Sequence, residues 1–115
     1  MKTETRRTGL MWVYMTAGSR AEARNVAAAL VAERLAACVN ILGPIESIYR
    51  WKGAVERGRE VALVAKTRRS NLKQLAARVK ALHSYESPCV VALPIVGGHP
   101  DFLSWIRSET ATTEK

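Results

Sequence analysis

The order in which apolar patterns follow one another limits the fold of this chain more than any other feature. Ser19–Arg34 carries apolar residues at helical spacing, and Ser19 precedes Glu22 by three residues, as in a capping box. A second segment with this spacing begins at Ser70, which can cap it, and is broken by Ser87-Pro88. The sequence therefore predicts two amphipathic helices.

Short apolar runs lie before, between and after these helices, and they predict strands. The runs are Leu10–Thr16, Ala37–Ile41 with a continuation at Ile45–Trp51, Glu60–Thr67, and Cys89–Ile95. Gly43-Pro44 is expected to interrupt the second run, because proline has no N–H for the ladder. Turn signals at Lys52-Gly53 and Arg57-Gly58 predict that the second and third strands form one long hairpin. Pro100 can open a last short helix, Asp101–Arg107.

The resulting order, β-α-β-β-α-β followed by a helix, predicts an α+β fold of the ferredoxin-like sandwich type. The length of 115 residues fits one domain, residues 1–115. Its ordered core is expected at about residues 10–107, with Met1–Thr8 and Ser108–Lys115 as flexible ends.

In this fold both helices cover one face of an antiparallel sheet, and the second and fourth strands are outermost. The other face is expected to expose Trp12 or Leu63, depending on the register. Exposed apolar area and unpaired strand edges favour aggregation, so the sequence predicts that copies of the chain assemble into a closed oligomer.

The formal net charge is +8, and such an excess can attract nucleic acid, acidic proteins or anionic ligands. The basic residues are dispersed and no nucleic-acid motif accompanies them, so a solvated basic surface is favoured and nucleic acid is not expected as a partner.

Leu10–Met15 is too short for a membrane core, and no membrane partner is expected. Cys38 and Cys89 form no CxxC motif, which fits a reducing compartment, and we expect a cytoplasmic protein.

No motif of a known catalytic class is found in the sequence. It holds no GxSxG, P-loop, GxGxxG, HExxH or EF-hand pattern. The chain is therefore not expected to be a conventional enzyme.

Polar side chains gather after the second predicted helix, at His83, Tyr85 and Glu86. His83 and Glu86 can bind a cation, but one histidine and one carboxylate are fewer than a tight site requires. A capped, hydrogen-bonded helix end explains them equally well. Cys38 and Cys89 are soft donors or small buried side chains, and their strands lie at opposite edges, which argues against a disulfide between them.

Aromatic residues close the second predicted strand. Tyr49 and Trp51 can stack on a ligand or pack against a neighbouring subunit, and packing is the favoured interpretation. Lys66 ends an apolar strand, where it can face an anion or a carboxylate such as Glu86, or extend its amine to solvent.

Six stretches together resemble the CutA family, and the resemblance covers about Met11 to Ile106. The stretches are Glu33–Asn40, Ser47–Gly53, Val64–Thr67, His83–Pro88, Ala92–Ile95 and Asp101–Ile106. The resemblance implies a ferredoxin-like subunit in a homotrimer, with PII-like architecture, edge strands paired between subunits and a hairpin that reaches a neighbour. It implies tolerance to divalent metals, copper especially. The cleft it implies between subunits involves Cys38, Tyr49, Trp51, Lys66, His83, Tyr85 and Glu86.

The sequence departs from the family at the positions to which copper binding is assigned, a cysteine and two adjacent histidines. These positions hold Met15, Leu82 and His83, and only His83 is kept. The Met15 thioether is a soft donor that suits Cu(I), and Cys89, where the family has a glutamate, can supply a thiolate.

Two hypotheses follow. The first is a trimeric metal-response protein that binds copper or another divalent metal, with His83, Glu86, Cys38, Cys89 and Met15 as candidate ligands and Tyr49, Trp51, Lys66 and Tyr85 lining the cleft. The alternative is a PII-like signalling protein that binds a small anion or a partner protein, suggested by the net charge and Lys66.

Overall fold

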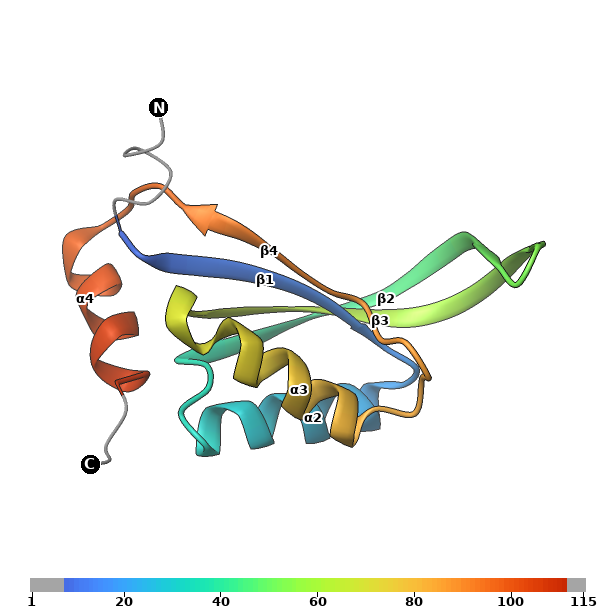
Figure 1. Cartoon of the computed structure of the whole chain (residues 1–115), viewed down its shortest axis with the longest axis horizontal. Helices are drawn as coiled ribbons and strands as arrows, with labels where there is room; N and C mark the ends of the chain where they lie inside the picture. The colour runs from blue at the N-terminus through green and yellow to red at the C-terminus, as the bar shows by residue number, and fades with distance from the viewer. Residues whose placement is uncertain (1–7, 112–115) are drawn as a thin grey trace.

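Residues 8–111 are described by a computed structural model of the chain, in which four strands and three α-helices alternate (Figure 1). In chain order the elements are β1 (Leu10–Ala17), α2 (Arg20–Ala32), β2 (Cys38–Trp51), β3 (Ala54–Arg68), the 3-10 turn η1 (Arg69–Asn71), α3 (Leu72–Leu82), β4 (Val90–Ile95) and α4 (Pro100–Glu109). No helix in this range is long and apolar enough to cross a bilayer.

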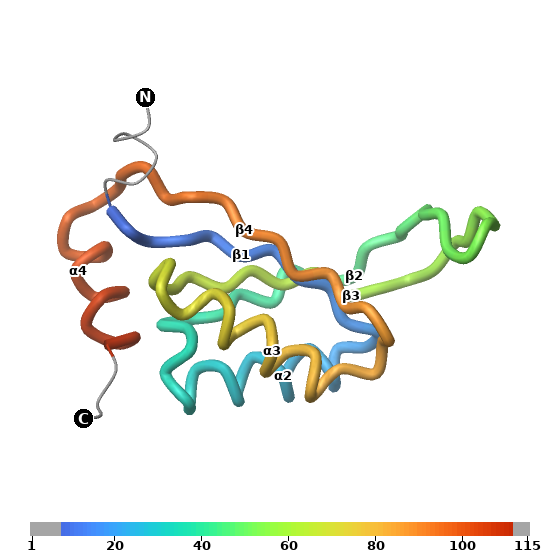
Figure 2. The backbone as a smooth tube through the Cα atoms, in the orientation of Figure 1, coloured from blue at the N-terminus to red at the C-terminus, as the bar shows by residue number. Residues whose placement is uncertain are grey.

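The four strands form one antiparallel sheet in the order β2-β3-β1-β4. This is the predicted α+β, ferredoxin-like arrangement, and β2 and β4 are the outer strands as expected. Helices α2 and α3 lie side by side on one face of the sheet (Figure 1), and the tube in Figure 2 shows the other face without a helix over its middle.

The core lies between the sheet and the two helices, because alternate residues of β1 point toward them. Val13 and Met15 are at most 1% exposed, and they pack with Leu30 of α2 and Leu75 of α3. The register places Leu63 on the same face as Met15, so Leu63 is buried. Trp12 points to the open face and is 37% exposed, which settles the alternative that the sequence left open.

The hairpin of β2 and β3 is longer than predicted and extends beyond the helices (Figure 1). The only turn is at Lys52-Gly53, where both residues have positive φ. The expected turn at Arg57-Gly58 is wrong, because Arg57 pairs with Ile48 and Gly58 with Ser47 inside the ladder. The expected break at Gly43-Pro44 is also wrong: a bulge with Gly43 at φ 121° carries β2 through it, and Pro44 is tolerated on an edge strand.

The two covering helices begin differently from one another. The Ser19 side chain accepts from the Glu22 N–H at 3.1 Å, so the predicted cap of α2 is confirmed. Ser70 does not cap α3; it lies inside the turn η1, and Asn71 occupies the cap position without a side-chain cap bond. The buried Asn71 amide instead donates to the carbonyls of Arg34 and Thr110, at 3.3 and 3.2 Å, and ties three segments together.

Helix α4 packs at the end of the sheet where β1 begins, with Ile106 against Leu10. It continues to Glu109, past the predicted end at Arg107, and Thr110 is 1% exposed with its hydroxyl donating to the Ile106 carbonyl. Ser108 and Glu109 are therefore helical, and not part of a flexible end. The rest of the expected flexible ends, residues 1–7 and 112–115, lies outside the described residues.

Candidate functional site

A cavity of about 960 Å³ lies over the open face of the sheet, between β1, the long hairpin and the segment that joins α3 to β4. We call it the hairpin cleft. Its walls are formed by Tyr14, Thr16, Ile45, Glu46, Ser47, Ile48, Tyr49, Trp51, Glu60, Tyr85, Glu86, Ser87 and Cys89. Three of these side chains are carboxylates and none is a lysine or an arginine, although the whole chain carries a net charge of +8.

Three of the four predicted cleft residues line this cavity, and one does not. Tyr49, Trp51 and Tyr85 form part of its walls. Lys66 is six residues along β3 from Glu60, which at the rise of a strand is about 20 Å away. Its amine donates to the Asn40 side-chain oxygen. The expected contact between Lys66 and Glu86 is therefore wrong; the Glu86 carboxylate instead lies 3.8 Å from the Lys52 amine.

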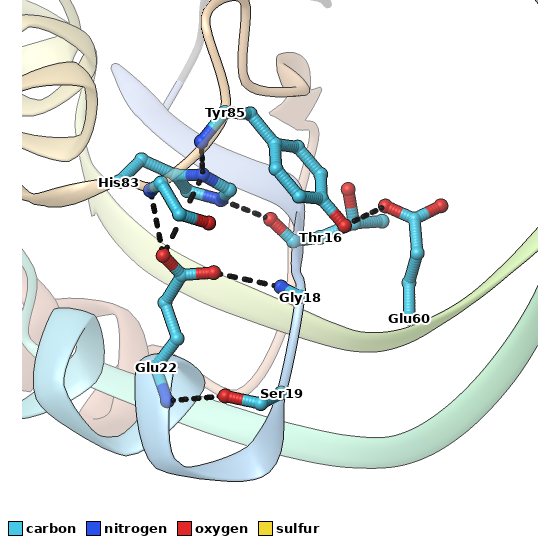
Figure 3. Close-up of polar contacts among 8 residues, drawn as sticks. Thr16, Gly18, Ser19, Glu22, Glu60, His83 and Tyr85 are labelled. Atoms are coloured by element: carbon cyan, nitrogen blue, oxygen red, sulfur yellow. Dashed lines mark hydrogen bonds and ion pairs between the residues drawn. The ribbon is translucent and has the colours of Figure 1, made fainter.

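Tyr85 is fixed to the sheet by a hydrogen bond that crosses one side of the cleft (Figure 3). Its hydroxyl donates to a Glu60 carboxylate oxygen at 3.1 Å. Burial of the phenol, followed by the negative charge and hydrogen bond of Glu60, raises the pKa of Tyr85 to about 12. Tyr85 therefore stays protonated and bonded to Glu60 throughout the physiological range.

His83 has both ring nitrogens in hydrogen bonds, and its side chain is 1% exposed. Nδ1 accepts the Tyr85 backbone N–H at 3.0 Å, so Nδ1 carries no proton. The proton is then on Nε2, which lies 2.7 Å from the Thr16 carbonyl and donates to it. This pattern describes a neutral imidazole with no lone pair left for a metal ion.

Glu22 lies next to His83, and its carboxylate accepts from two backbone N–H groups (Figure 3). Its carboxylate accepts from Gly18 and Ser84, both at 2.7 Å, and lies 3.9 Å from His83 Nδ1. Burial opposes the charge of Glu22, but the hydrogen bonds from Gly18 and Ser84 outweigh it and lower the pKa of the carboxyl group. The same side chain thus joins the start of α2 to the segment that carries Tyr85.

Gly18 lies where these groups converge, and a side chain there would be in tight contact with them. A methyl group at Gly18 would lie 3.3 Å from the Glu22 carboxylate and 3.4 Å from the Tyr85 ring. Thr16, Gly18, Glu22 and Glu60 were not predicted from the sequence as site residues. Glu22 had one visible signal, its capping-box spacing, and the other three had none.

The candidate metal ligands are not brought together within one chain. Met15 is 1% exposed in the core under the helices, on the opposite face from the hairpin cleft, and Cys38 begins β2 opposite Lys66, at the other end of that strand from the cleft residues Tyr49 and Trp51. Glu86 and Cys89 line the cleft. Among residues 8–111, no group of three or more His, Cys, Asp or Glu side chains could hold a metal ion. The donors of a single subunit therefore do not fit a closed metal site.

Cys89 lies at the cleft wall close to Glu60. Partial burial, followed by the Glu60 charge, raises the pKa of the Cys89 thiol. The thiol is therefore protonated at neutral pH, and a metal that bound there would have to displace the proton.

Comparison with known proteins places the chain among characterised sequences and folds. The model of the CutA1 divalent ion tolerance protein family matches residues 11–109. The chain is 49% identical over 98 residues to the divalent-cation tolerance protein CutA of Thermus thermophilus, covering 85% of this chain and 95% of the relative. It is 45% identical to the chloroplastic protein CutA of Arabidopsis thaliana over 85% of this chain, and spans about half of that relative, 54%.

Comparison of the fold with solved structures points to the same family. The structure of the periplasmic divalent cation tolerance protein CutA from Archaeoglobus fulgidus matches with a TM-score of 0.85 at 42% identity, over 88% of this chain and 98% of that chain. Sequence and structure agree over nearly all the described residues, and the family is named for tolerance to ions and not for a reaction. The chain belongs to the CutA1 divalent ion tolerance protein family.

Proposed function

We propose that this protein serves divalent-cation tolerance by binding a cation in the hairpin cleft, at a site that is completed when copies of the chain assemble as a homotrimer. The observation that carries the proposal is the composition of the cleft wall. In a strongly basic chain, the cleft wall carries Glu46, Glu60 and Glu86, and the Lys52 amine, 3.8 Å from Glu86, leaves the other two without an ion pair among residues 8–111. Such a cavity attracts cations and repels anions.

The ligands would come from the carboxylates and the thiol that face the cleft. Glu46, Glu60, Glu86 and Cys89 are the carboxylates and the thiol among its lining residues. A tight site needs three or more converging ligands. Because one subunit does not converge three, a second copy has to supply the rest. Thiolates suit Cu(I), so Cys89 and the edge residue Cys38 keep copper as a candidate cation. His83 would join only after giving up its bond from Tyr85.

The homotrimer is supported by the surface that one chain leaves uncovered. Trp12 and Leu93 are neighbours on the open face, and Leu93 is 59% exposed. The hairpin adds Ile48 and Val55, which are 62% and 61% exposed. The outer strands β2 and β4 each present an unpaired edge. Light scattering or native mass spectrometry should report three chains, and a stable single chain at micromolar concentration would contradict the proposal.

Titration calorimetry with Zn²⁺ and Cu²⁺ tests the cation site directly. We expect Glu60→Gln and Glu86→Gln each to weaken binding about tenfold, which corresponds to ~1.4 kcal/mol. Glu56→Gln is the matched control, because Glu56 lies on the same hairpin outside the cleft wall. Equal affinity in all four proteins, or an equal loss in the control, would remove the cleft as the cation site.

The PII-like alternative gains no support from the cleft. This alternative predicts that the anion binds near Lys66, but Lys66 lies about 20 Å along β3 from the cleft residue Glu60. We also keep the cytoplasm as the proposed location, on the grounds that Cys38 and Cys89 are free thiols. Cell fractionation tests it, since relatives named chloroplastic and periplasmic occur.

A further inference from the structure

A second cavity, of about 470 Å³, lies at the other end of the sheet from the hairpin cleft. It is formed where β1 begins, where β3 runs into η1, and beside α4, the end at which the two terminal elements meet in Figure 1. Arg68, Arg69 and Arg107 line it together with Ser70 and Gly9. We call it the arginine pocket. Among residues 8–111, no carboxylate lines it.

Two of the arginines are held in place by backbone carbonyls. Arg68 donates through Nε and Nη2 to the Arg107 carbonyl, at 3.1 and 2.6 Å. Arg107 donates through Nη2 to the Thr8 carbonyl at 3.1 Å. A guanidinium has five N–H groups in a rigid fork, so each side chain keeps donors for a ligand after these bonds are made.

The third arginine is placed by its main chain. The Arg69 N–H donates to the Gly9 carbonyl at 2.8 Å, which sets the start of η1 against the start of β1. Arg69 is exposed, and it lines the pocket together with Ser70. None of the ion pairs within residues 8–111 involves Arg68, Arg69 or Arg107.

Three guanidinium groups around one cavity repel one another, and an anion with several oxygens relieves this repulsion. Planar guanidinium forks match the oxygens of phosphate, and charge-assisted bonds of this kind are among the strongest that side chains make. We propose that the arginine pocket is a binding site for a phosphate-type oxyanion, either free or as the phosphoryl group of a small molecule. Fixed arginines reduce the entropy lost on binding.

This proposal is independent of the cation site. The two cavities share no lining residue, and they lie at opposite ends of β1 and β3, near Leu10 and Arg68 in one case and near Thr16 and Glu60 in the other. Loss of either function leaves the other testable in the same protein.

The test is titration of inorganic phosphate into the full chain at constant ionic strength, followed by calorimetry and by amide NMR shifts. We expect saturable binding that moves the Gly9 and Ser70 amides. Arg69→Gln and Arg107→Gln should each weaken it about tenfold, the effect of removing one charge-assisted hydrogen bond. Arg24→Gln removes the same charge from the exposed surface of α2 and should leave the affinity unchanged.

A phosphate monoester, glycerol 3-phosphate, distinguishes the two sources of the anion. Equal affinity for both probes assigns the site to the free anion, whereas tighter binding of the ester assigns it to a phosphorylated small molecule. No saturable phosphate binding, or a loss in Arg24→Gln as large as that in Arg69→Gln, overturns the proposal. Arg69 is exposed and makes no side-chain hydrogen bond within residues 8–111. Arg69→Gln is therefore expected to fold, and it keeps the test valid if Arg107→Gln unfolds.

Discussion

The two ends of β1 and β3 use polar side chains in opposite ways. Beside the hairpin cleft, the side chains of His83, Glu22 and Tyr85 bond to nearby backbone groups and to Glu60. At the arginine pocket, the side chains bond to backbone carbonyls and keep N–H groups to spare. The first end is a closed network that holds structure, and the second is an open set of donors.

The comparison teaches that net charge does not describe local chemistry. A chain with a net charge of +8 has a cleft lined by carboxylates, and three of its arginines line a pocket at the far end of the same strands. Substitutions in the closed network should therefore reduce stability, whereas substitution of Arg69, whose side chain makes no hydrogen bond within residues 8–111, should reduce binding only.

The largest effect is expected for His83→Ala. It removes two hydrogen bonds and a buried ring, so we expect the free energy of unfolding to fall by about 3 kcal/mol. Urea denaturation measures it. His99→Ala is the matched control, because His99 is exposed and only caps α4, at a cost of about 1 kcal/mol. Equal losses in the two variants would break the comparison.

Glu22→Gln should come next, with a loss of about 1.5 kcal/mol at pH 7 from weakened bonds to two backbone N–H groups. The pKa of Glu22 is lowered in the folded state, so its contribution is present above the unfolded pKa and is lost as pH falls through the folded pKa. Denaturation from pH 7 to pH 3 should therefore show a smaller acid effect in Glu22→Gln than in the parent protein. Glu33→Gln, at an exposed pair with Arg78, should keep the parent profile.

Tyr85→Phe tests the same network from its other side. We expect a loss of about 1 kcal/mol near pH 8, when the hydrogen bond to Glu60 is removed. Because the folded pKa of Tyr85 is raised to about 12, the stability it contributes is present below the unfolded value near 10 and lost as pH rises toward 12. The difference in unfolding free energy between the parent and Tyr85→Phe should shrink across that window. A constant difference would show that Tyr85 titrates normally.

The smallest effect on stability is expected for Arg69→Gln. An exposed side chain at an open set of donors should change the free energy of unfolding by no more than about 0.5 kcal/mol. The same urea experiment measures it beside His83→Ala. A loss as large as that of His83→Ala would place Arg69 in a structural network and end the distinction between the two ends.

Local patterns predicted the fold because each element carries its own periodicity. The helix of α2, its Ser19 cap and the order of strands all follow from spacing within a few residues. The turn expected at Arg57-Gly58 failed because a dipeptide signal is weaker than a continuing ladder, in which Gly58 pairs with Ser47. Strand pairing over that distance is decided by many residues together.

Few residues of the candidate site could be predicted from patterns within a short stretch of sequence. Tyr49, Trp51 and Tyr85 line the cavity of one chain, but the residues alone favoured packing for Tyr49 and Trp51, and the cleft between subunits was what the family resemblance implied. Glu22 was not predicted as a site residue, because its carboxylate also accepts from the Ser84 N–H and the two residues are 62 positions apart in the sequence. Lys66 was wrongly expected near Glu86 for a similar reason. The length of β3 separates Lys66 from Glu60, and no short sequence pattern predicts that length.

The two free cysteines have a consequence for handling the protein in air. Cys38 and Cys89 belong to opposite margins of the sheet, which are three strand spacings, or about 14 Å, apart. Oxidation cannot join them within one chain, since disulfides require Cα atoms within about 7 Å. It can only link one copy to the next, so aged samples should show a ladder of covalent multimers on gels run without reductant, and a Cys38→Ser preparation should stop that ladder at two copies.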